Sequence, residues 1–243
     1  MMLMTVIFLQ SCSSSGGSDI KTENPESAYL IAKSRYDKKE YYDAIEDFNL
    51  IKLKFSGSSI IDKAVYYLGM SYYKQEEYIL AIYEFETMVK NYPTSSFSED
   101  SRYMLAMCYF RLSPEYYLDQ TYTGYALREF QNFIDLYPSS KYKTDSEKRM
   151  KELKNKLAYK TLMNAEMYFN LGNYKSAIVY YNNLLENYFE TDYADDALYG
   201  KIQALVKKKN YDEARKEIER FEKRFPGSNL KGKVFSLKSN LQE

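Results

Sequence analysis

The sequence predicts an all-α protein, a solenoid of five helix pairs, from two observations. An alanine lies eleven residues before an aromatic residue five times along the 243-residue chain. Proline and glycine fall between the apolar helical segments and seldom inside them. Such self-similarity marks repeat architectures, in which each unit buries its apolar face against its neighbours. The pairs are Ala44 with Phe55, Ala81 with Tyr92, Ala126 with Tyr137, Ala177 with Tyr188, and Ala214 with Phe225.

The spacing of these alanines predicts where the array is interrupted. Ala44 and Ala81 lie 37 residues apart, as do Ala177 and Ala214, so 37 residues is the base period. An insertion of 8 residues near 113–123 is rich in tyrosine and predicts a loop within repeat three. A second insertion, of 14 residues, falls in 141–171, which has no proline or glycine. We therefore expect one long helix between repeats three and four.

The first residues have the pattern of a lipoprotein leader. Residues 1–11 contain an apolar run that is too short to span a bilayer and fits a signal peptide. Leu9, Gln10, Ser11 and Cys12 resemble a bacterial lipobox, which implies cleavage before Cys12 and its lipidation. Ser13, rather than aspartate, after that cysteine favours the outer membrane by the same resemblance. A plain secreted protein and a cytosolic protein with a misassigned start remain alternatives.

The rest of the chain divides into a tether and two groups of repeats. Residues 12–24 are small and polar and predict a flexible tether. Asn24 and Pro25 form a helix-start signal, as N-cap and first helical residue. We expect repeats one to three in 25–140, and repeats four and five in 141–243, with a capping helix over 229–241.

The composition argues against most kinds of chemistry. Lysine plus arginine and aspartate plus glutamate both number 34, which gives no bias toward nucleic acid. Histidine is absent, which removes the commonest general base and metal ligand. Cys108 fits a buried, inert thiol, Asp195 and Asp196 fit acids at a helix start, and 207–209 fits a basic helix end. We expect no enzymatic activity, no cofactor and no metal.

The stretch from Ala64 to Phe85 resembles the tetratricopeptide repeat. Leu68, Gly69, Tyr72, Tyr78, Ala81 and Phe85 match its pattern, whereas Lys201 and Arg215 replace apolar residues in repeat five. The resemblance implies a peptide-binding groove lined by the first helix of each pair, with some of these residues instead in the core between repeats. Carried over, the groove residues are Tyr29, Lys33, Tyr36, Lys63, Tyr66, Met70, Tyr73, Lys74, Tyr103, Met107, Phe110 and Arg111.

The lipobox, the five repeats and the long helix together resemble the BamD family of outer-membrane protein assembly lipoproteins. This implies a lipid-anchored scaffold on the periplasmic face of the outer membrane that binds a BamA-type barrel insertase and unfolded β-barrel proteins. A Tol–Pal type coordinator and an envelope enzyme acting on glycan are the alternatives. The cations proposed for docking of the insertase are Lys207, Lys208, Arg215 and Arg220.

Overall fold

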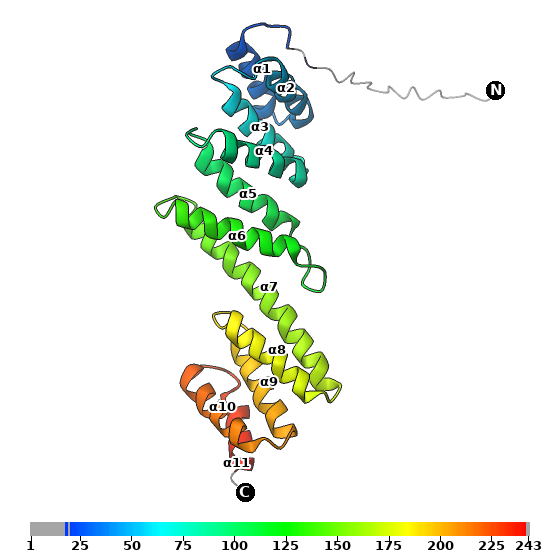
Figure 1. The fold of residues 1–243 in the computed structure, drawn as a ribbon, viewed down its shortest axis with the longest axis vertical. Helices are drawn as coiled ribbons and strands as arrows, with labels where there is room; N and C mark the ends of the chain where they lie inside the picture. Colours follow the sequence, from blue (N-terminus) through cyan, green and yellow to red (C-terminus); the bar gives the residue numbers. More distant parts are fainter. Residues whose placement is uncertain (1–17, 19, 242–243) are drawn as a thin grey trace, which may run out of the picture. The chain divides into compact units, whose positions relative to one another are not determined.

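The structure confirms an all-α protein. The computed structural model describes Ser18 and residues 20–241, and every regular element in this part of the chain is a helix (Figure 1). The number of repeats remains a prediction. The helices are α1 (Pro25–Asp37), α2 (Tyr41–Lys54), α3 (Ile61–Lys74), α4 (Tyr78–Asn91), α5 (Ser98–Leu112), α6 (Thr121–Leu136), α7 (Lys143–Asn170), α8 (Tyr174–Asn187), α9 (Ala194–Lys207), α10 (Tyr211–Arg224) and α11 (Lys231–Asn240).

The chain divides into two compact units, with the boundary in the sequence inside α5. The N-terminal unit ends at Leu105, and the C-terminal unit begins at Ala106. In the N-terminal unit α1, α2, α3 and α4 pack in chain order, and α1 also contacts α3. In the C-terminal unit α6 to α11 pack in the same consecutive way, and α7 also contacts α9. The first helices α1 and α7 therefore each contact both their own partner and the next first helix, as expected for stacked repeats.

The repeat period is visible in the backbone as well as in the side chains. Lys39, Glu76, Gly172 and Lys209 have φ angles of 66°, 62°, 75° and 61°. Each of the four lies five residues before one of the repeat alanines and directly follows the C-cap of a first helix. A residue in this left-handed conformation ends a helix and turns the chain into the next one. Three of the four turns use a residue with a side chain, at a cost in backbone strain.

The repeat alanines mark where paired helices approach most closely. Ala44, Ala81, Ala126, Ala177 and Ala214 are all completely buried. Four residues after each alanine stands a large buried side chain, which fills the space that the alanine leaves. These five residues are Phe48, Phe85, Phe130, Tyr181 and Ile218.

The N-terminal helix start is as predicted, but the tether is shorter than predicted. The Asn24 side chain accepts a hydrogen bond from the Ser27 amide, and Pro25 is the first residue of α1. Ile20 is buried in the apolar core of α1 to α3, and the Ser18 hydroxyl donates to Asp47. This apolar contact offsets the entropy of ordering the segment, so the tether prediction is wrong for its last residues. The predicted lipidation site Cys12 lies outside the described residues.

Both predicted insertions are confirmed, with small shifts in their bounds. The second is the long helix α7, Lys143–Asn170. The first predicted insertion, near 113–123, forms the loop between α5 and α6. Its last residues lie in α6, which begins at Thr121. Lysines of α7 hold this loop: Lys156 Nζ donates to the Pro114 carbonyl at 2.9 Å, and Lys160 Nζ donates to the Leu118 carbonyl at 2.6 Å. These hydrogen bonds satisfy carbonyl groups of the loop and hold the loop against α7.

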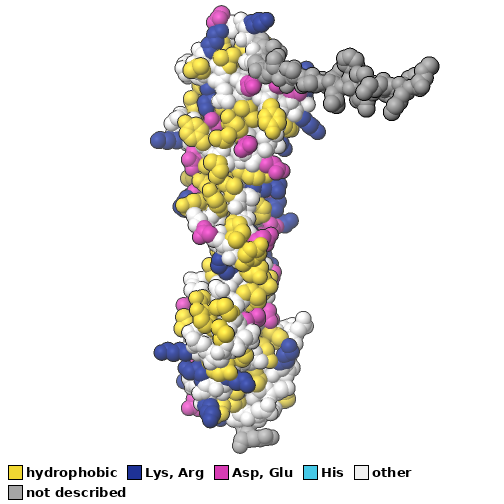
Figure 2. All heavy atoms as spheres, turned by 90° about the vertical axis from the view of Figure 1, so that its right-hand side faces the viewer, with side chains coloured by type: hydrophobic (Ala, Val, Ile, Leu, Met, Phe, Trp, Pro, Cys, Tyr) yellow, Lys and Arg dark blue, Asp and Glu magenta, His cyan; other side chains and the backbone are white. Residues whose placement is uncertain are grey.

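Two further predictions can be checked directly. The predicted capping helix is α11, which packs on α10 through the buried Val234. Cys108 is a buried free thiol, and burial raises its pKa, so it is inert as predicted. Figure 2 shows patches of apolar side chains with charged side chains between them. Among the helices in the described ranges, none has the length and apolarity that crossing a bilayer requires.

Candidate peptide-binding surfaces

Aromatic rings join α1 to α3 in the N-terminal unit. We call the set Tyr29, Tyr36, Tyr66, Tyr67 and Phe97 the tyrosine cluster. Tyr67 lies at its centre, with ring centroids 6.2 Å from Tyr29, 5.1 Å from Tyr36 and 5.2 Å from Tyr66. Tyr66 stacks on Phe97 at 4.5 Å. Burial raises the pKa of Tyr29 and of Tyr36 to about 12, so both phenols are neutral hydrogen-bonding groups at any physiological pH.

Two lysines cover the tyrosine cluster. Lys33 Nζ lies 4.8 Å from the centroid of the Tyr67 ring and forms an ion pair with Asp37 at 2.5 Å. Lys63 Nζ lies 6.0 Å from the centroid of the Tyr29 ring. Ammonium groups at these distances are attracted by the ring faces. The surface therefore offers half-buried phenol rings with positive charge at their edge, which suits a peptide that carries aromatic side chains and a carboxylate.

The structure separates the predicted groove residues of the N-terminal unit into two kinds. Tyr29, Tyr36 and Tyr66 are half-buried members of the tyrosine cluster, so much of each ring is inter-repeat core. At the end of α3, Met70 and Tyr73 are half-buried and Lys74 is exposed. The Tyr73 ring meets the Tyr78 ring edge-on at 5.4 Å. This end of α3 is the part of the predicted groove best placed to contact a ligand.

The predicted groove residues of α5 fall in both units. Tyr103 is half-buried in the N-terminal unit; Met107, Phe110 and Arg111 belong to the C-terminal unit. Met107 is buried, as are its neighbours Ala106 and Cys108, so its predicted place on a binding surface is corrected: little of its side chain is accessible to a ligand. The Phe110 ring contacts Phe130 at 6.3 Å and the Arg149 guanidinium at 5.0 Å. Arg111 is exposed.

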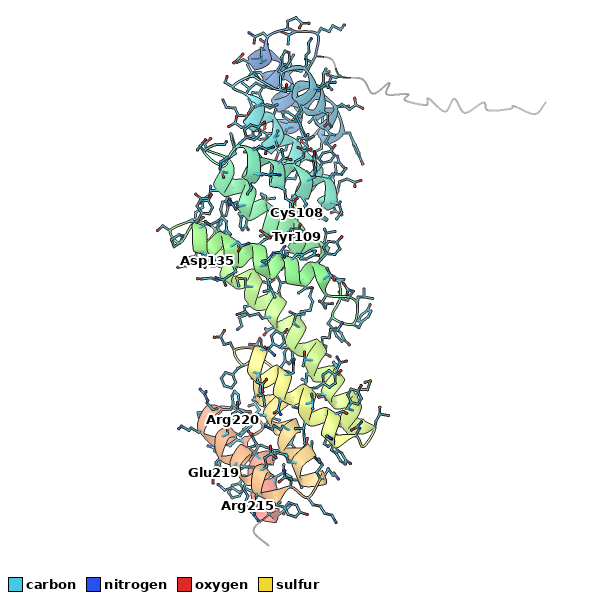
Figure 3. The ribbon with its side chains drawn as sticks, in the orientation of Figure 1. Cys108, Tyr109, Asp135, Arg215, Glu219 and Arg220 are labelled. Atoms are coloured by element: carbon cyan, nitrogen blue, oxygen red, sulfur yellow. The ribbon has the colours of Figure 1, made fainter. Side chains whose placement is uncertain are left out.

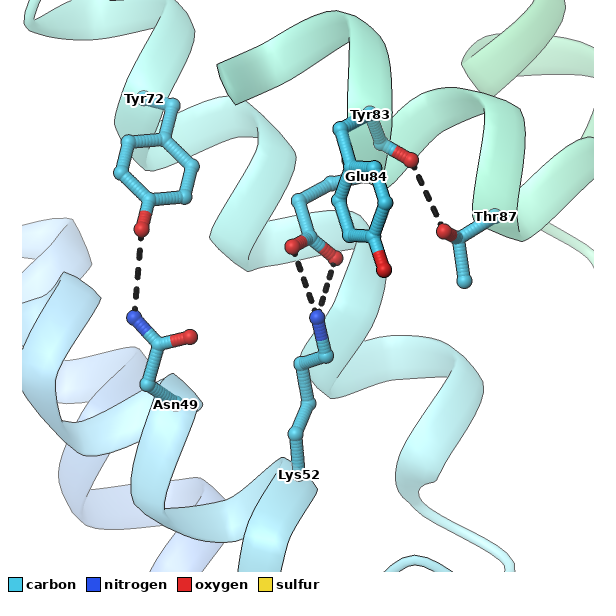
Figure 4. A network of polar contacts seen from close by, with 6 residues as sticks. All are labelled: Asn49, Lys52, Tyr72, Tyr83, Glu84 and Thr87. Atoms are coloured by element: carbon cyan, nitrogen blue, oxygen red, sulfur yellow. Dashed lines mark hydrogen bonds and ion pairs between the residues drawn. The ribbon is translucent and has the colours of Figure 1, made fainter.

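A buried ion pair ties the second helices of the N-terminal unit together. Lys52 Nζ on α2 donates to both carboxylate oxygens of Glu84 on α4, at 2.7 and 2.6 Å (Figure 4). Burial raises the pKa of the Glu84 carboxyl, while Lys52 opposes that shift. Nearby, Asn49 Nδ2 donates to the Tyr72 hydroxyl at 3.3 Å. These contacts link successive repeats and explain the polar residues at otherwise apolar positions.

The cations predicted for partner docking lie near the end of the chain. Lys207 is the last residue of α9 and Lys208 is its C-cap, and both are exposed. Arg215 and Arg220 stand on α10 with Glu219 (Figure 3). Arg215 Nη2 donates to the Leu241 carbonyl at 2.9 Å, which ties the end of the capping helix to α10. Part of the function of Arg215 is therefore structural.

The unusual lysine of repeat five is explained by a partner. Lys201 is buried, and its Nζ lies 2.7 Å from Glu217 Oε1. Glu217 also pairs with Arg220 at 3.3 Å. A buried ammonium needs such a partner, because an unpaired charge is costly in the protein interior.

Sequence reasoning missed the central ring of the tyrosine cluster. The tetratricopeptide pattern places Tyr66 in the predicted groove and does not include its neighbour Tyr67. The detectable signal was local: Tyr67 stands fourteen residues before Ala81, where repeat five has Gly200. A position that holds the largest ring in one repeat and no side chain in another is a position where the repeats differ in surface chemistry.

The paired helices and their contacts define a tetratricopeptide-repeat protein. A family model described as tetratricopeptide repeat matches residues 196–228. The fold is similar to the TPR2AB-domain:pHSP90 complex of yeast Sti1, with a TM-score of 0.50 and 15% identity over 90% of this chain and 83% of that one. It is also similar to a TPR repeats protein of Bacteroides fragilis, with a TM-score of 0.47 and 12% identity over 91% and 99%.

Within that class the chain can be placed in a family. The model of the YfiO family, described as outer membrane lipoprotein, matches residues 21–207, and the chain belongs to this family. A curated relative, the outer membrane protein assembly factor BamD of Rickettsia prowazekii, is 27% identical over 124 residues. The match covers 51% of this chain and spans about half of the relative, 49% of its length.

Proposed function

We propose that the chain is a non-catalytic scaffold of outer-membrane protein assembly. It binds a BamA-type insertase through its C-terminal repeats and unfolded β-barrel proteins through its N-terminal repeats. The observation that carries this proposal is the family match over most of the helical array. The exposed and half-buried residues at the end of α3, together with the lysines over the tyrosine cluster, support a peptide-binding function for the N-terminal unit.

The insertase interaction is tested by purification from detergent-solubilised membranes. The tagged chain should retain a BamA-type barrel in about equal amount. A double variant, Lys207→Gln with Lys208→Gln, should lower that yield, because both lysines are exposed and neither forms an ion pair with another described residue. The matched control is Lys38→Gln with Lys90→Gln, which removes two exposed lysines from the N-terminal unit. Absence of such a barrel from the wild-type preparation would rule the proposal out.

The client interaction is tested with a peptide that ends in an aromatic residue and a free carboxylate. Tyr73→Ala with Lys74→Gln should weaken its binding about tenfold, since it removes one ring and one charge-assisted contact. Tyr42→Ala with Lys38→Gln is the control, because both residues are exposed and lie outside the proposed surface. Equal losses in both variants would argue against a specific groove.

The membrane anchor is tested at Cys12, the residue that the lipobox resemblance selects. Cys12→Ser should move the protein from the membrane fraction to the soluble fraction after cell lysis. Retention of the variant on membranes, in salt that strips peripheral proteins, would count against lipidation.

A further inference from the structure

The C-terminal unit contains a cavity that the proposed function does not use. It has a volume of about 300 Å³ and is lined by residues of α7, α8, α9 and α11. Its size is at the lower end of the range for small-ligand pockets, about 300 to 1,000 Å³. It therefore has room for one side chain rather than for a folded element. The lining that matters here is Glu166, Tyr181, Asp196, Tyr199, Gly200 and Lys233.

The position of Gly200 in the repeat explains why the space is open. Gly200 stands fourteen residues before Ala214, as Tyr67 does before Ala81. In the N-terminal unit the Tyr67 ring fills this place and stacks on Phe48 at 6.1 Å. In the C-terminal unit the residue equivalent to Phe48 is Tyr181, and a Cβ at position 200 would lie 2.4 Å from its Cζ atom. The missing side chain and the phenol of Tyr181 therefore belong together.

The charges at the equivalent positions are reversed. Glu166 stands eleven residues before its repeat alanine, where repeat one has Lys33. Asp196 stands eighteen residues before its repeat alanine, where repeat two has Lys63. The tyrosine cluster thus carries two lysines, and the cavity carries two carboxylates at the same places of the repeat.

The polar groups of the cavity have no partner of their own. Tyr181 is 3% exposed, and its hydroxyl end lines the cavity. Within the part of the chain that the structure describes, neither this hydroxyl nor the carboxylates of Glu166 and Asp196 has a hydrogen-bond or ion-pair partner. Glu166 and Asp196 are exposed residues, so their carboxylates stand at the open edge of the cavity, and together with the Tyr181 hydroxyl they offer acceptors to a ligand that donates hydrogen bonds.

The electrostatics of the cavity favour a cation. Desolvation raises the pKa of the Glu166 carboxyl, and the charge of Asp196 raises it further. Desolvation likewise raises the pKa of Asp196, with Asp195 adding to the shift and Lys233 opposing it. Lys233 is the only cation in the lining, and its Nζ lies 5.9 Å from the Tyr199 ring. The carboxylates of Glu166 and Asp196 together with the Lys233 ammonium leave the lining with a net charge of one negative unit.

We infer that this cavity binds the guanidinium group of an arginine side chain in an extended segment of a partner polypeptide. A planar guanidinium can donate to both carboxylates and to the Tyr181 hydroxyl, and it can stack on an aromatic face such as that of Tyr199. Lysine fits less well, because a compact ammonium cannot bridge separated acceptors in one plane. This inference does not depend on which partners the chain has in the membrane.

The test titrates the full chain, labelled with ¹⁵N, with a capped nonapeptide of glycine and serine around one central arginine. The control peptide replaces arginine by citrulline, which keeps the shape and removes the charge. We expect amide shifts at Gly200 and Gln203, and binding of the citrulline peptide at least about tenfold weaker, because hydrogen bonds between charged groups are lost. Glu166→Gln with Asp196→Asn should weaken the arginine peptide by a similar factor.

A matched variant separates a specific site from the general charge of the unit. Glu186→Gln with Glu219→Gln makes the same change of charge at two exposed positions outside the cavity and should leave the affinity unchanged. The inference is overturned if the arginine peptide does not bind, if citrulline binds as well, or if both double variants bind alike. Free arginine amide that binds as tightly as the peptide would overturn the assignment to a polypeptide.

Discussion

The place between α1 and α3 and the equivalent place between α7 and α9 share one backbone design. In both, a residue with positive φ follows the first helix, at Lys39 and at Gly172. In both, a serine in the loop after a second helix bonds to an aspartate at the start of the preceding first helix. Ser95 Oγ, after α4, donates to Asp62 of α3 at 2.6 Å, and Ser228 Oγ, after α10, donates to Asp195 of α9 at 2.7 Å. The two places differ in their side chains, since one is filled by rings and edged by lysines, and the other is open and acidic.

This difference shows how an array built from one kind of helix pair can present two different surfaces. The buried alanines and the large residues four positions after them maintain the helix packing in both places. The groove positions do not take part in that packing to the same degree. They carry Tyr67 in one unit and Gly200 in the other, while the turn with positive φ recurs in both units.

The largest expected effect comes from opening the filled place. Tyr67→Gly should lower the free energy of unfolding by about 3 to 5 kcal/mol, since it removes the central ring and puts glycine inside a helix. Denaturation by urea gives the value. Tyr42→Ala, which removes an exposed ring, should change it by less than about 0.5 kcal/mol. A small loss for Tyr67→Gly would mean that the tyrosine cluster is not core.

The next effect concerns the buried charge of the C-terminal unit. Glu217→Ala should cost about 3 to 5 kcal/mol, because Lys201 is left without its partner. Lys201→Leu, which copies Leu68 of repeat two, should be neutral or stabilising, since Glu217 keeps Arg220. The double variant should therefore recover most of the loss. If the losses in the double variant were additive, the unpaired Lys201 charge would not be the reason that Glu217→Ala is destabilising.

A smaller effect tests the open place. Gly200→Ala should cost about 1 to 3 kcal/mol, because the new Cβ would meet the Tyr181 ring at 2.4 Å. Gly124→Ala is the matched control in α6, where nothing lies within 4 Å of the added atom, and it should be neutral or stabilising by up to about 1 kcal/mol. Equal effects at the two glycines would contradict the close contact.

The helix ends should respond weakly. Glu76→Gly should stabilise the N-terminal unit by up to about 1 kcal/mol, because glycine removes the strain of a positive φ but gains entropy in the unfolded chain. Lys90→Gly, inside α4, should be destabilising, because glycine is unfavourable within a helix. The thermal midpoint of each variant distinguishes the two signs.

The smallest effect is a dependence on pH. Glu166 and Asp196 have raised pKa values in the folded chain, so the folded state keeps protons that the unfolded state has released. Stability from these groups therefore falls as the pH rises from about 4, the ordinary carboxyl value, through the raised values. Glu166→Gln with Asp196→Asn should flatten that fall in urea midpoints measured between pH 4 and pH 7. An unchanged slope would argue against the acidic environment.

The sequence alone was sufficient to predict the features that depend on the repeat spacing or on a local residue pattern. The long helix, the N-cap at Asn24, the capping helix and the inert Cys108 follow from local residue patterns, and the structure confirms them. The buried Ile20 could not be predicted, because its burial depends on a contact with a distant part of the chain. The burial of Met107 is of the same kind, since it depends on what covers α5 rather than on the residues of α5.

The candidate surfaces were predictable only in part. The family pattern selects first-helix positions but does not tell core from groove, so it gave Tyr66 and missed Tyr67. Asp195 and Asp196 both lie in the first turn of α9, as predicted, but that pattern did not indicate that Asp196 also lines a cavity. The cavity depends on a glycine and a distant phenol that meet only in the folded chain.

The central claim is that the two ends of the array bind different polypeptides through different chemistry. It is tested most directly by placing a photo-crosslinking benzophenone residue at Tyr73 or at Gln203 in cells and identifying each crosslinked product by mass spectrometry. The account predicts unfolded β-barrel proteins at Tyr73 and a different polypeptide, joined through a segment that contains arginine, at Gln203. The same polypeptide at both positions, or none at either, would contradict it.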